Sequence, residues 1–228
     1  MLQRLAPKLL ESVAELHQAH MRKLPSILLI TFAFACTAKK DASQTDTTAS
    51  STTSTTGTET PIASTETAVA PEVNPPGDIS DSQAFIIYQN TVGGYQLEVP
   101  EGWARAETGG KVTFISKLDG VSVTVAPASA APTAASVQAN EAKLIQSHGR
   151  AVSITGVSEA NLPGGKAVVI KYTSNSEPNS VTNKRVRLEN IAYLFHRNGK
   201  EATLTVSAPQ GADNVDQWNR MANSFRWL

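Results

Sequence analysis

Cysteine is almost absent from this chain of 228 residues, which contains only Cys36. A lone cysteine excludes an intramolecular disulfide and a zinc site built from several thiolates. Common catalytic signatures are missing as well, because the chain has no GxSxG elbow, HExxH helix, P-loop or GxGxxG phosphate loop. The sequence therefore predicts neither a disulfide scaffold nor any of these enzyme classes.

Large apolar residues are missing from one long stretch near the N-terminus. Residues 41–60 contain nine Thr and four Ser but no aromatic or large aliphatic residue. Such a segment cannot bury enough apolar surface to offset its loss of conformational entropy. We expect residues 36–82 to form a Ser/Thr-rich disordered tether. We expect residues 83–228, which are enough for a hydrophobic core, to form one folded domain.

The chain has no net charge, but its 20 basic and 20 acidic side chains are unevenly distributed. Residues 1–36 carry four basic and two acidic groups, residues 37–82 carry two and seven, and residues 83–228 carry fourteen and eleven. The domain at +3 lacks the concentrated cationic surface that nucleic acid binding needs. We expect no nucleic acid partner and a solvated acidic linker.

Residues 21–35 have the pattern of a secretory signal. Met21, Arg22 and Lys23 form a basic start, and an apolar run follows from residue 24 to residue 35. The run is too short to cross a bilayer of about 30 Å comfortably as a permanent helix. Cys36 follows the run directly, so the signal ends at the only cysteine.

The end of this run resembles the bacterial lipoprotein signal, in which Leu, a small residue and Gly or Ala precede the cysteine that receives diacylglycerol. The box here reads Ala33-Phe34-Ala35-Cys36, in which Phe34 is bulkier than usual. The resemblance implies that lipid on Cys36 holds the domain at the cell membrane or outer membrane, facing outside the cytoplasm. An Asp directly after the cysteine would retain the protein in the inner membrane. Thr37 occupies this position, which favours the outer membrane in a cell with two membranes. The alternative is an ordinary signal peptide with a chance cysteine.

Residues 1–20 precede this signal and allow two interpretations. Leu5, Leu9 and Leu16 recur at helical spacing, together with Val13, and would fit an amphipathic helix. Translation from Met21 would instead make residues 1–20 an upstream extension. We favour the second interpretation because it leaves the signal with a basic start.

The domain contains short alternating runs bounded by glycine and proline, which predict half-buried strands. The segment 184–197 is alternating too, but one of its faces is charged near Arg187 and apolar near Phe195. We therefore expect it to be a central strand with a helix over half of its outer side. The other alternating runs are 95–99, 112–114, 121–125, 168–172 and 202–206.

Two segments predict helices. Residues 133–148 place Val137, Leu144 and Ile145 on one side and end before a glycine. Residues 213–225 begin with Asp213 as the N-cap and carry an apolar stripe that needs a sheet to cover. The predicted fold class is α+β, a mainly antiparallel β-sheet sandwiched by α-helices. The stripe consists of Val215, Trp218, Met221, Ala222 and Phe225.

The domain resembles the Mog1/PsbP-like family, which includes photosystem II extrinsic proteins and many bacterial lipoproteins. The matching stretches are GYQLEVPEGW at 94–103 with the strands up to residue 125, FHRNGK at 195–200 with the following strand, and Trp218 with SFRW at 224–227. These are fold-forming positions, so the resemblance implies architecture rather than activity. Asn198-Gly199 is predicted to be a tight hairpin turn.

One basic cluster, made of Lys184, Arg185 and Arg187, is a candidate contact for an anionic group of a partner or a lipid headgroup. We expect Lys200 near it on the adjoining hairpin. A solvated strand end is the simpler interpretation, and we favour it. The two histidines of the domain, His148 and His196, are accounted for by a helix end and a strand end. We expect no catalytic residue, metal or cofactor.

The sequence therefore predicts a membrane-tethered, extracytoplasmic accessory or binding domain without catalytic activity, which is monomeric and has a protein partner. Two alternatives stay open. A photosystem II extrinsic accessory protein would require a photosynthetic source. An enzyme with an unrecognised site would require a deep pocket in which titratable side chains converge.

Overall fold

The computed structural model describes residues 66–108 and 110–228. The chain divides into two units, Met1–Thr55 and Thr56–Leu228, and the described residues all belong to the second. The predicted upstream extension, the signal, the lipidation site Cys36 and most of the predicted tether therefore lie outside the described residues.

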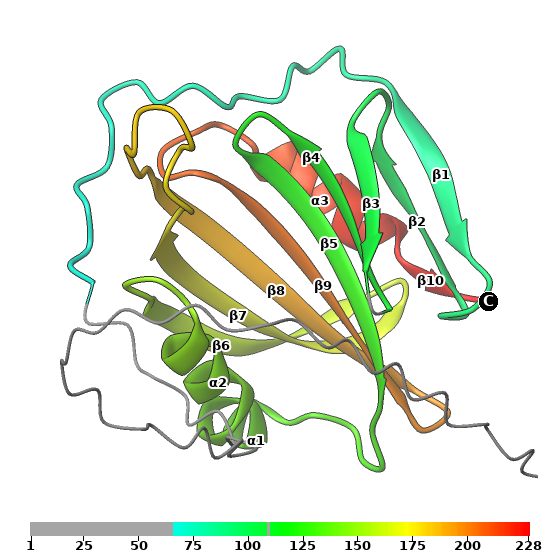
Figure 1. The fold of residues 1–228 in the computed structure, drawn as a ribbon. Helices are drawn as coiled ribbons and strands as arrows, with labels where there is room; N and C mark the ends of the chain where they lie inside the picture. The colour runs from blue at the N-terminus through cyan, green and yellow to red at the C-terminus, as the bar shows by residue number, and fades with distance from the viewer. Residues whose placement is uncertain (1–65, 109) are drawn as a thin grey trace, which may run out of the picture. The chain divides into compact units, whose positions relative to one another are not determined.

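The described part combines ten strands with three helices, which confirms the predicted α+β class (Figure 1). The strands are β1 (Phe85–Asn90), β2 (Tyr95–Pro100), β3 (Ala104–Thr108), β4 (Lys111–Ser116), β5 (Asp119–Pro127), β6 (Ser153–Leu162), β7 (Gly165–Asn175), β8 (Arg187–Arg197), β9 (Lys200–Pro209) and β10 (Arg226–Trp227). The helices are α1 (Ala134–Ala139), α2 (Glu141–His148) and α3 (Val215–Ser224).

Seven strands form one large antiparallel sheet in the order β3-β4-β5-β9-β8-β7-β6. Most neighbours in this order are consecutive in the chain, so short hairpins can join them. The β8–β9 hairpin turns at Asn198 and Gly199, whose φ angles of 51° and 74° are those of a type I′ turn. The predicted hairpin turn is confirmed.

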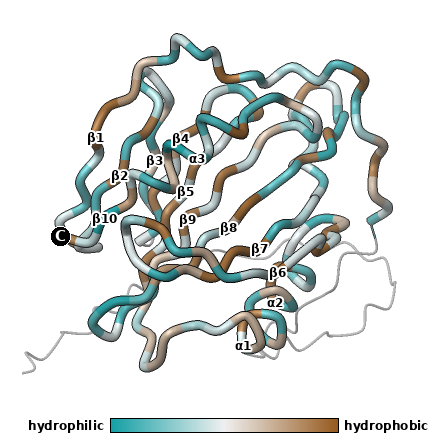
Figure 2. The backbone as a smooth tube through the Cα atoms, turned by 180° about the vertical axis from the view of Figure 1, so that it is seen from behind, coloured by the Kyte–Doolittle hydropathy of each residue, from teal (hydrophilic) through white to brown (hydrophobic). Residues whose placement is uncertain are grey.

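Strand β8 carries apolar side chains on both faces because the sheet is covered on both sides. Ala192 and Leu194 pack with Val137 of α1 in the smaller core cluster. Tyr193 and Phe195 belong to the larger cluster, which includes residues of β2 and α3. Figure 2 shows apolar positions along these central strands. The central position predicted for this strand is confirmed.

A second sheet, in the order β1-β2-β10, contributes to the larger cluster together with α3. The ring of Phe225, directly after α3, joins the two sheets. Its centroid lies 4.4 Å from that of Phe195 in β8 and 5.8 Å from that of Tyr95 in β2, stacked on both. The aromatic end of the chain is therefore part of the core, as the sequence predicted.

The predicted helix at 133–148 is in fact two helices that break at Asn140, whose φ and ψ are −117° and −78°. Thr133 and Ser136 close a capping box that starts α1. Asparagine is a poor residue for a helix interior because its side chain competes for backbone hydrogen bonds, which accounts for the break. The prediction that Leu144 faces the sheet was wrong, since α2 turns Ala142 inward and leaves Leu144 55% exposed.

Helix α3 begins later than predicted, with Asn214 rather than Asp213 at its N-cap. The side chain of Asn214 makes no capping bond because it binds another segment: its Oδ1 accepts from the Ile79 N–H at 2.6 Å, and its Nδ2 donates to the Gly77 carbonyl at 2.8 Å. Val215 was wrongly placed on the buried stripe, because it is 62% exposed. Trp218, Met221, Ala222 and Phe225 are all buried as predicted.

Residues 66–84, which we call the strap, pack on the domain ahead of β1 (Figure 1, cyan). Ile79 is 6% exposed and belongs to the larger core cluster. The sequence predicted that the domain begins at residue 83, because the strap lacks alternating apolar residues. A single buried isoleucine, hydrogen bonds with the side chains of Asn175 and Asn214, and ion pairs of Glu66 hold the strap instead.

Candidate functional site

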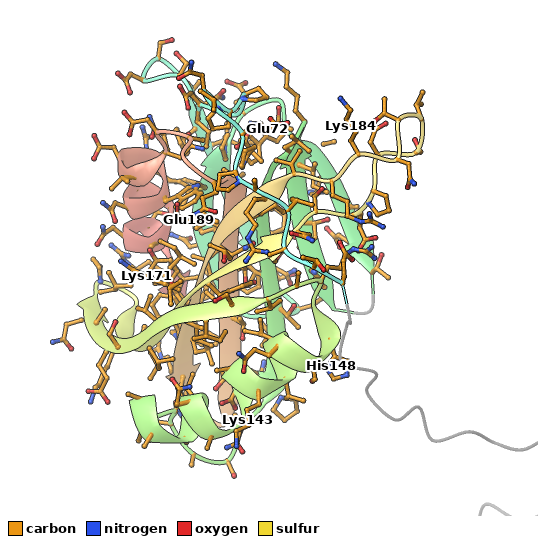
Figure 3. The ribbon with its side chains drawn as sticks, turned by 90° about the vertical axis from the view of Figure 1, so that its left-hand side faces the viewer. Glu72, Lys143, His148, Lys171, Lys184 and Glu189 are labelled. Atoms are coloured by element: carbon orange, nitrogen blue, oxygen red, sulfur yellow. The ribbon has the colours of Figure 1, made fainter. Side chains whose placement is uncertain are left out.

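The three residues of the predicted basic cluster lie at the start of β8 and differ in exposure. Lys184 is exposed in the loop before the strand, and Figure 3 shows it at the same end of the domain as Glu72. The side chain of Arg185 is 32% exposed. Arg187 is only 6% exposed. The cluster is therefore not one exposed patch.

The guanidinium of Arg187 is used inside the fold. Its Nη1 donates to the Ala151 carbonyl at 2.7 Å and to the Asn175 Oδ1 at 3.1 Å, while Nη2 donates to the Thr173 hydroxyl. Burial lowers the pKa of Arg187, but a guanidinium stays charged in proteins. Arg187 therefore positions Asn175 and brings a fixed positive charge close to it.

Asn175, the last residue of β7, is 4% exposed and uses both ends of its amide. Its Oδ1 accepts from the Val69 N–H at 3.1 Å as well as from Arg187. Its Nδ2 donates to the Thr67 carbonyl at 2.9 Å and to the Glu66 carboxylate at 2.7 Å. One buried side chain thus contacts the main chain and the side chain of the strap.

The Glu66 carboxylate is held through both of its oxygens. Oε2 lies 2.7 Å from Nη2 of Arg150, and Oε1 lies 3.0 Å from Nε of Arg185 as well as bonding to Asn175. We call Arg150, Asn175 and Arg185 the carboxylate cradle. The Arg185 contact is an ion pair. Guanidinium groups recognise carboxylates by their fixed charge and their planar set of donors.

Positive charge predominates around the cradle. The cations are Arg150, Arg185 and Arg187, whereas the acids in contact are Glu66 and Glu177. Glu177 lies 3.5 Å from Arg150 and is 82% exposed, so water screens it. Glu66, at 18% exposure, is the principal counter-charge.

Sequence reasoning found Arg185 and Arg187 but missed Arg150, Asn175 and Glu66. The contact between Glu66 and Asn175 joins residues 109 positions apart, and no local pattern marks it. Lys200 was wrongly expected nearby. It pairs with Arg197 at the opposite end of the 11-residue strand β8, so about 30 Å of strand separates it from Arg187.

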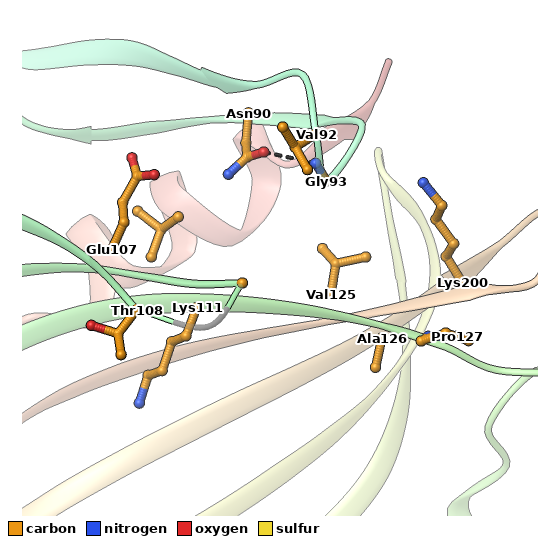
Figure 4. Close-up of a pocket in the computed structure, with 12 residues that line it drawn as sticks. Asn90, Val92, Gly93, Glu107, Thr108, Lys111, Val125, Ala126, Pro127 and Lys200 are labelled. Carbon is orange, nitrogen blue, oxygen red and sulfur yellow. Dashed lines mark hydrogen bonds between the residues drawn. The ribbon is translucent and has the colours of Figure 1, made fainter. Parts of the chain in front are cut away.

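A hollow of about 490 Å³ lies near Lys200, between the β1–β2 turn and the β3–β4 hairpin (Figure 4). The Gly93 N–H donates to the Asn90 side chain at 2.7 Å on its rim. Its titratable lining residues are Glu107, Lys111 and Lys200, and Figure 4 shows the two lysines pointing away from each other. This lining does not point to a particular reaction.

The histidines of the domain have structural contacts. Nδ1 of His148 lies 3.0 Å from the Leu144 carbonyl at the end of α2, and Nε2 of His196 lies 3.0 Å from the Ala128 carbonyl. Within residues 66–108 and 110–228, no group of three or more His, Cys, Asp or Glu side chains could hold a metal ion. None of the helices in this part of the chain is long and apolar enough to cross a membrane.

We expect Arg187→Lys to lower the free energy of unfolding by about 1 to 2 kcal/mol, because all three donors of a lysine sit on one atom and cannot reproduce the planar fork with which Arg187 reaches its three acceptors. Lys184→Ala, at an exposed position of the loop before β8, should change it by less than about 0.5 kcal/mol. Urea denaturation at pH 7 would measure both values. Equal effects would mean that the Arg187 hydrogen bonds add nothing to stability.

No protein-family model and no curated protein sequence matches the chain. Solved structures resemble it. A cyanobacterial PsbP (CyanoP) from Synechocystis sp. PCC 6803 is 19% identical, with a TM-score of 0.49, over 67% of this chain and 99% of that chain. The Saccharomyces cerevisiae Ran-binding protein Mog1p is 9% identical, with a TM-score of 0.44, over 64% of this chain and 96% of that one.

LpqN of Mycobacterium tuberculosis, a protein involved in cell envelope biogenesis, is 16% identical, with a TM-score of 0.36, over 64% of this chain and 85% of that chain. At these identities the likeness concerns the fold alone. PsbP and Mog1, the two names that the sequence resemblance gave its family, are both among these structures.

Proposed function

We propose that this chain is an exported lipoprotein whose α+β domain serves as a monomeric, non-catalytic binding or accessory module outside the cytoplasm. The observation that carries the proposal is the order of features along the chain. A basic start, an apolar run, Cys36, a Ser/Thr-rich segment and a folded domain follow one another. This order is that of a lipid-anchored domain on a spacer.

The spacing between anchor and domain supports this function. Residues 37–65, which number 29 (65 − 36), separate the proposed lipid from Glu66, the first described residue of the strap. A flexible spacer of that length has a root-mean-square span of about 30 Å. The domain would therefore reach partners near the membrane surface while staying attached.

We expect Cys36→Ser to abolish lipid attachment and membrane association. The full chain should be expressed in a bacterial host and its membrane fraction analysed by intact mass. The unaltered chain should begin at Cys36 and carry the mass of diacylglycerol with or without a further acyl chain, because two or more chains make release from a membrane slow. Thr37→Asp is the matched control, since it keeps the cysteine and should change only which membrane holds the protein. Soluble protein with an unmodified Cys36 would contradict the proposal.

A further inference from the structure

We infer that the carboxylate cradle is a binding site for an extended acidic peptide of a partner, and that Glu66 of the strap occupies this site in the unbound chain. This ligand is the kind of molecule that the proposed binding module would recognise. The inference rests on the proposed function only in that a partner must exist. It does not depend on the lipid at Cys36.

The cradle is held in place by contacts that do not involve Glu66. Arg187 fixes the amide of Asn175, and the Asn175 N–H donates to the Arg150 carbonyl at 2.8 Å. On the neighbouring loop, the Val186 N–H donates to the Ser176 hydroxyl at 3.0 Å, directly after Arg185. With the Asn175 amide and the main chain beside Arg150 and Arg185 fixed in this way, the site loses less entropy when a ligand enters it.

The contacts of Asn175 indicate a peptide rather than a simple anion. Besides the Glu66 carboxylate, this amide donates to the Thr67 carbonyl and accepts from the Val69 N–H. The cradle thus contacts a carboxylate together with main-chain groups one and three residues further on. Phosphate or acetate could satisfy the arginines but not these main-chain contacts.

Electrostatics favour exchange of Glu66 for another carboxylate over an empty site. The side chains of Arg150 and Arg185 are 30% and 32% exposed and share Glu66. Loss of that anion would leave two partly buried cations together, which is unfavourable unless another anion replaces it. Because Glu66 is in the same chain, its effective concentration at the cradle is in the millimolar range. A partner peptide must compete with Glu66 for the cradle. The apparent affinity of the unaltered chain for that peptide is therefore lower than that of an unoccupied cradle.

The test uses the full chain and a fluorescein-labelled peptide with the sequence of residues 64–72, which contains the Glu66 contacts. Glu66→Ala with Val69→Pro removes the carboxylate and one main-chain N–H of the strap. We expect this released variant to bind the peptide at least about tenfold more tightly than the unaltered chain, measured by fluorescence anisotropy. Glu72→Ala is the matched control, because Glu72 is an exposed acid of the same strap.

Two further arms identify the site and the ligand class. Arg185→Gln in the released variant should abolish binding, while circular dichroism checks that the domain is still folded. A peptide in which glutamine replaces the glutamate at position 66 tests the carboxylate without any change to the protein, and it should not bind. Acetate or phosphate at the same concentration should fail to displace the acidic peptide.

The inference is overturned if the released variant binds no more tightly than the unaltered chain, or if the glutamine peptide binds equally well. Displacement by acetate or phosphate as effective as that by unlabelled peptide would show a general anion site and would also overturn it. Each of these results leaves lipid attachment at Cys36 unaffected, so failure of the cradle and failure of the proposed anchoring are distinguishable.

Discussion

Trp218→Ala is expected to lower the free energy of unfolding by about 3 to 5 kcal/mol, a large part of the roughly 5 to 15 kcal/mol that holds a domain together. Trp218 is 5% exposed and lies in the larger core cluster, together with Met221 of α3 and with Phe225 directly after the helix. Its removal leaves a cavity between the helix and the sheet. A loss of this size in a domain of about this length corresponds to a fall in melting temperature of about 6 to 20 °C.

The matched control for Trp218 is Val215→Ala, at an apolar residue of the same helix that is 62% exposed, which should change stability by less than about 0.5 kcal/mol. Arg220, on the outer side of α3, is not a neutral position. Its Nε lies 2.6 Å from the Glu98 carboxylate, and its guanidinium lies 4.3 Å from the centre of the Phe85 ring. A mild effect of Trp218→Ala, equal to that of Val215→Ala, would mean that the helix is not anchored through this face.

Strands β2, β4, β5, β7, β8 and β9 could be predicted because their signals are local, whereas β1, β3, β6 and β10 were not predicted. Tyr95, Leu97 and Val99 alternate with polar residues in the sequence, and each is 1% exposed in the structure. The mixed faces of the segment 184–197 likewise indicated a strand covered on both sides. Period-two alternation follows directly from strand geometry, so tertiary contacts are not needed to recognise it.

The cradle and the start of α3 could not be predicted because they depend on contacts between distant segments. Asn214 begins α3 without capping it, since its amide binds Gly77 and Ile79 more than 130 residues earlier. The side chain of Asn175 likewise forms its hydrogen bonds with the strap and with Arg187. An asparagine in a sequence fits a cap, a turn or a surface equally well, so only the fold decides among these roles.

The buried carboxyl of Asp119 makes stability depend on pH. Asp119 begins β5 and is 6% exposed, and its Oδ1 accepts from Nδ2 of Asn214 at 3.4 Å. Burial raises the pKa of Asp119 to about 6 from its ordinary value of 3.8. The Asn214 hydrogen bond opposes this rise, and the charge of Asp78 adds to it. A raised pKa means that the folded chain holds this proton more tightly than the unfolded chain does. The contribution of Asp119 to the free energy of unfolding is therefore fully present below about pH 4 and is lost as the pH rises through about 6.

Asp119→Asn is therefore expected to stabilise the domain at pH 7.5 by about 2 to 3 kcal/mol and to change it little at pH 4, because the amide keeps the acceptor for Asn214 without a buried charge. Urea denaturation of both proteins at the two pH values isolates Asp119, since the other titrating groups are common to both. In a chain that keeps Asp119, Asp78→Asn should lower the pH at which this stability is lost, because the negative charge of Asp78 helps to raise the Asp119 pKa. A difference between the proteins that stays the same at both pH values would show that Asp119 does not titrate in this window, and that its carboxylate is compensated within the fold.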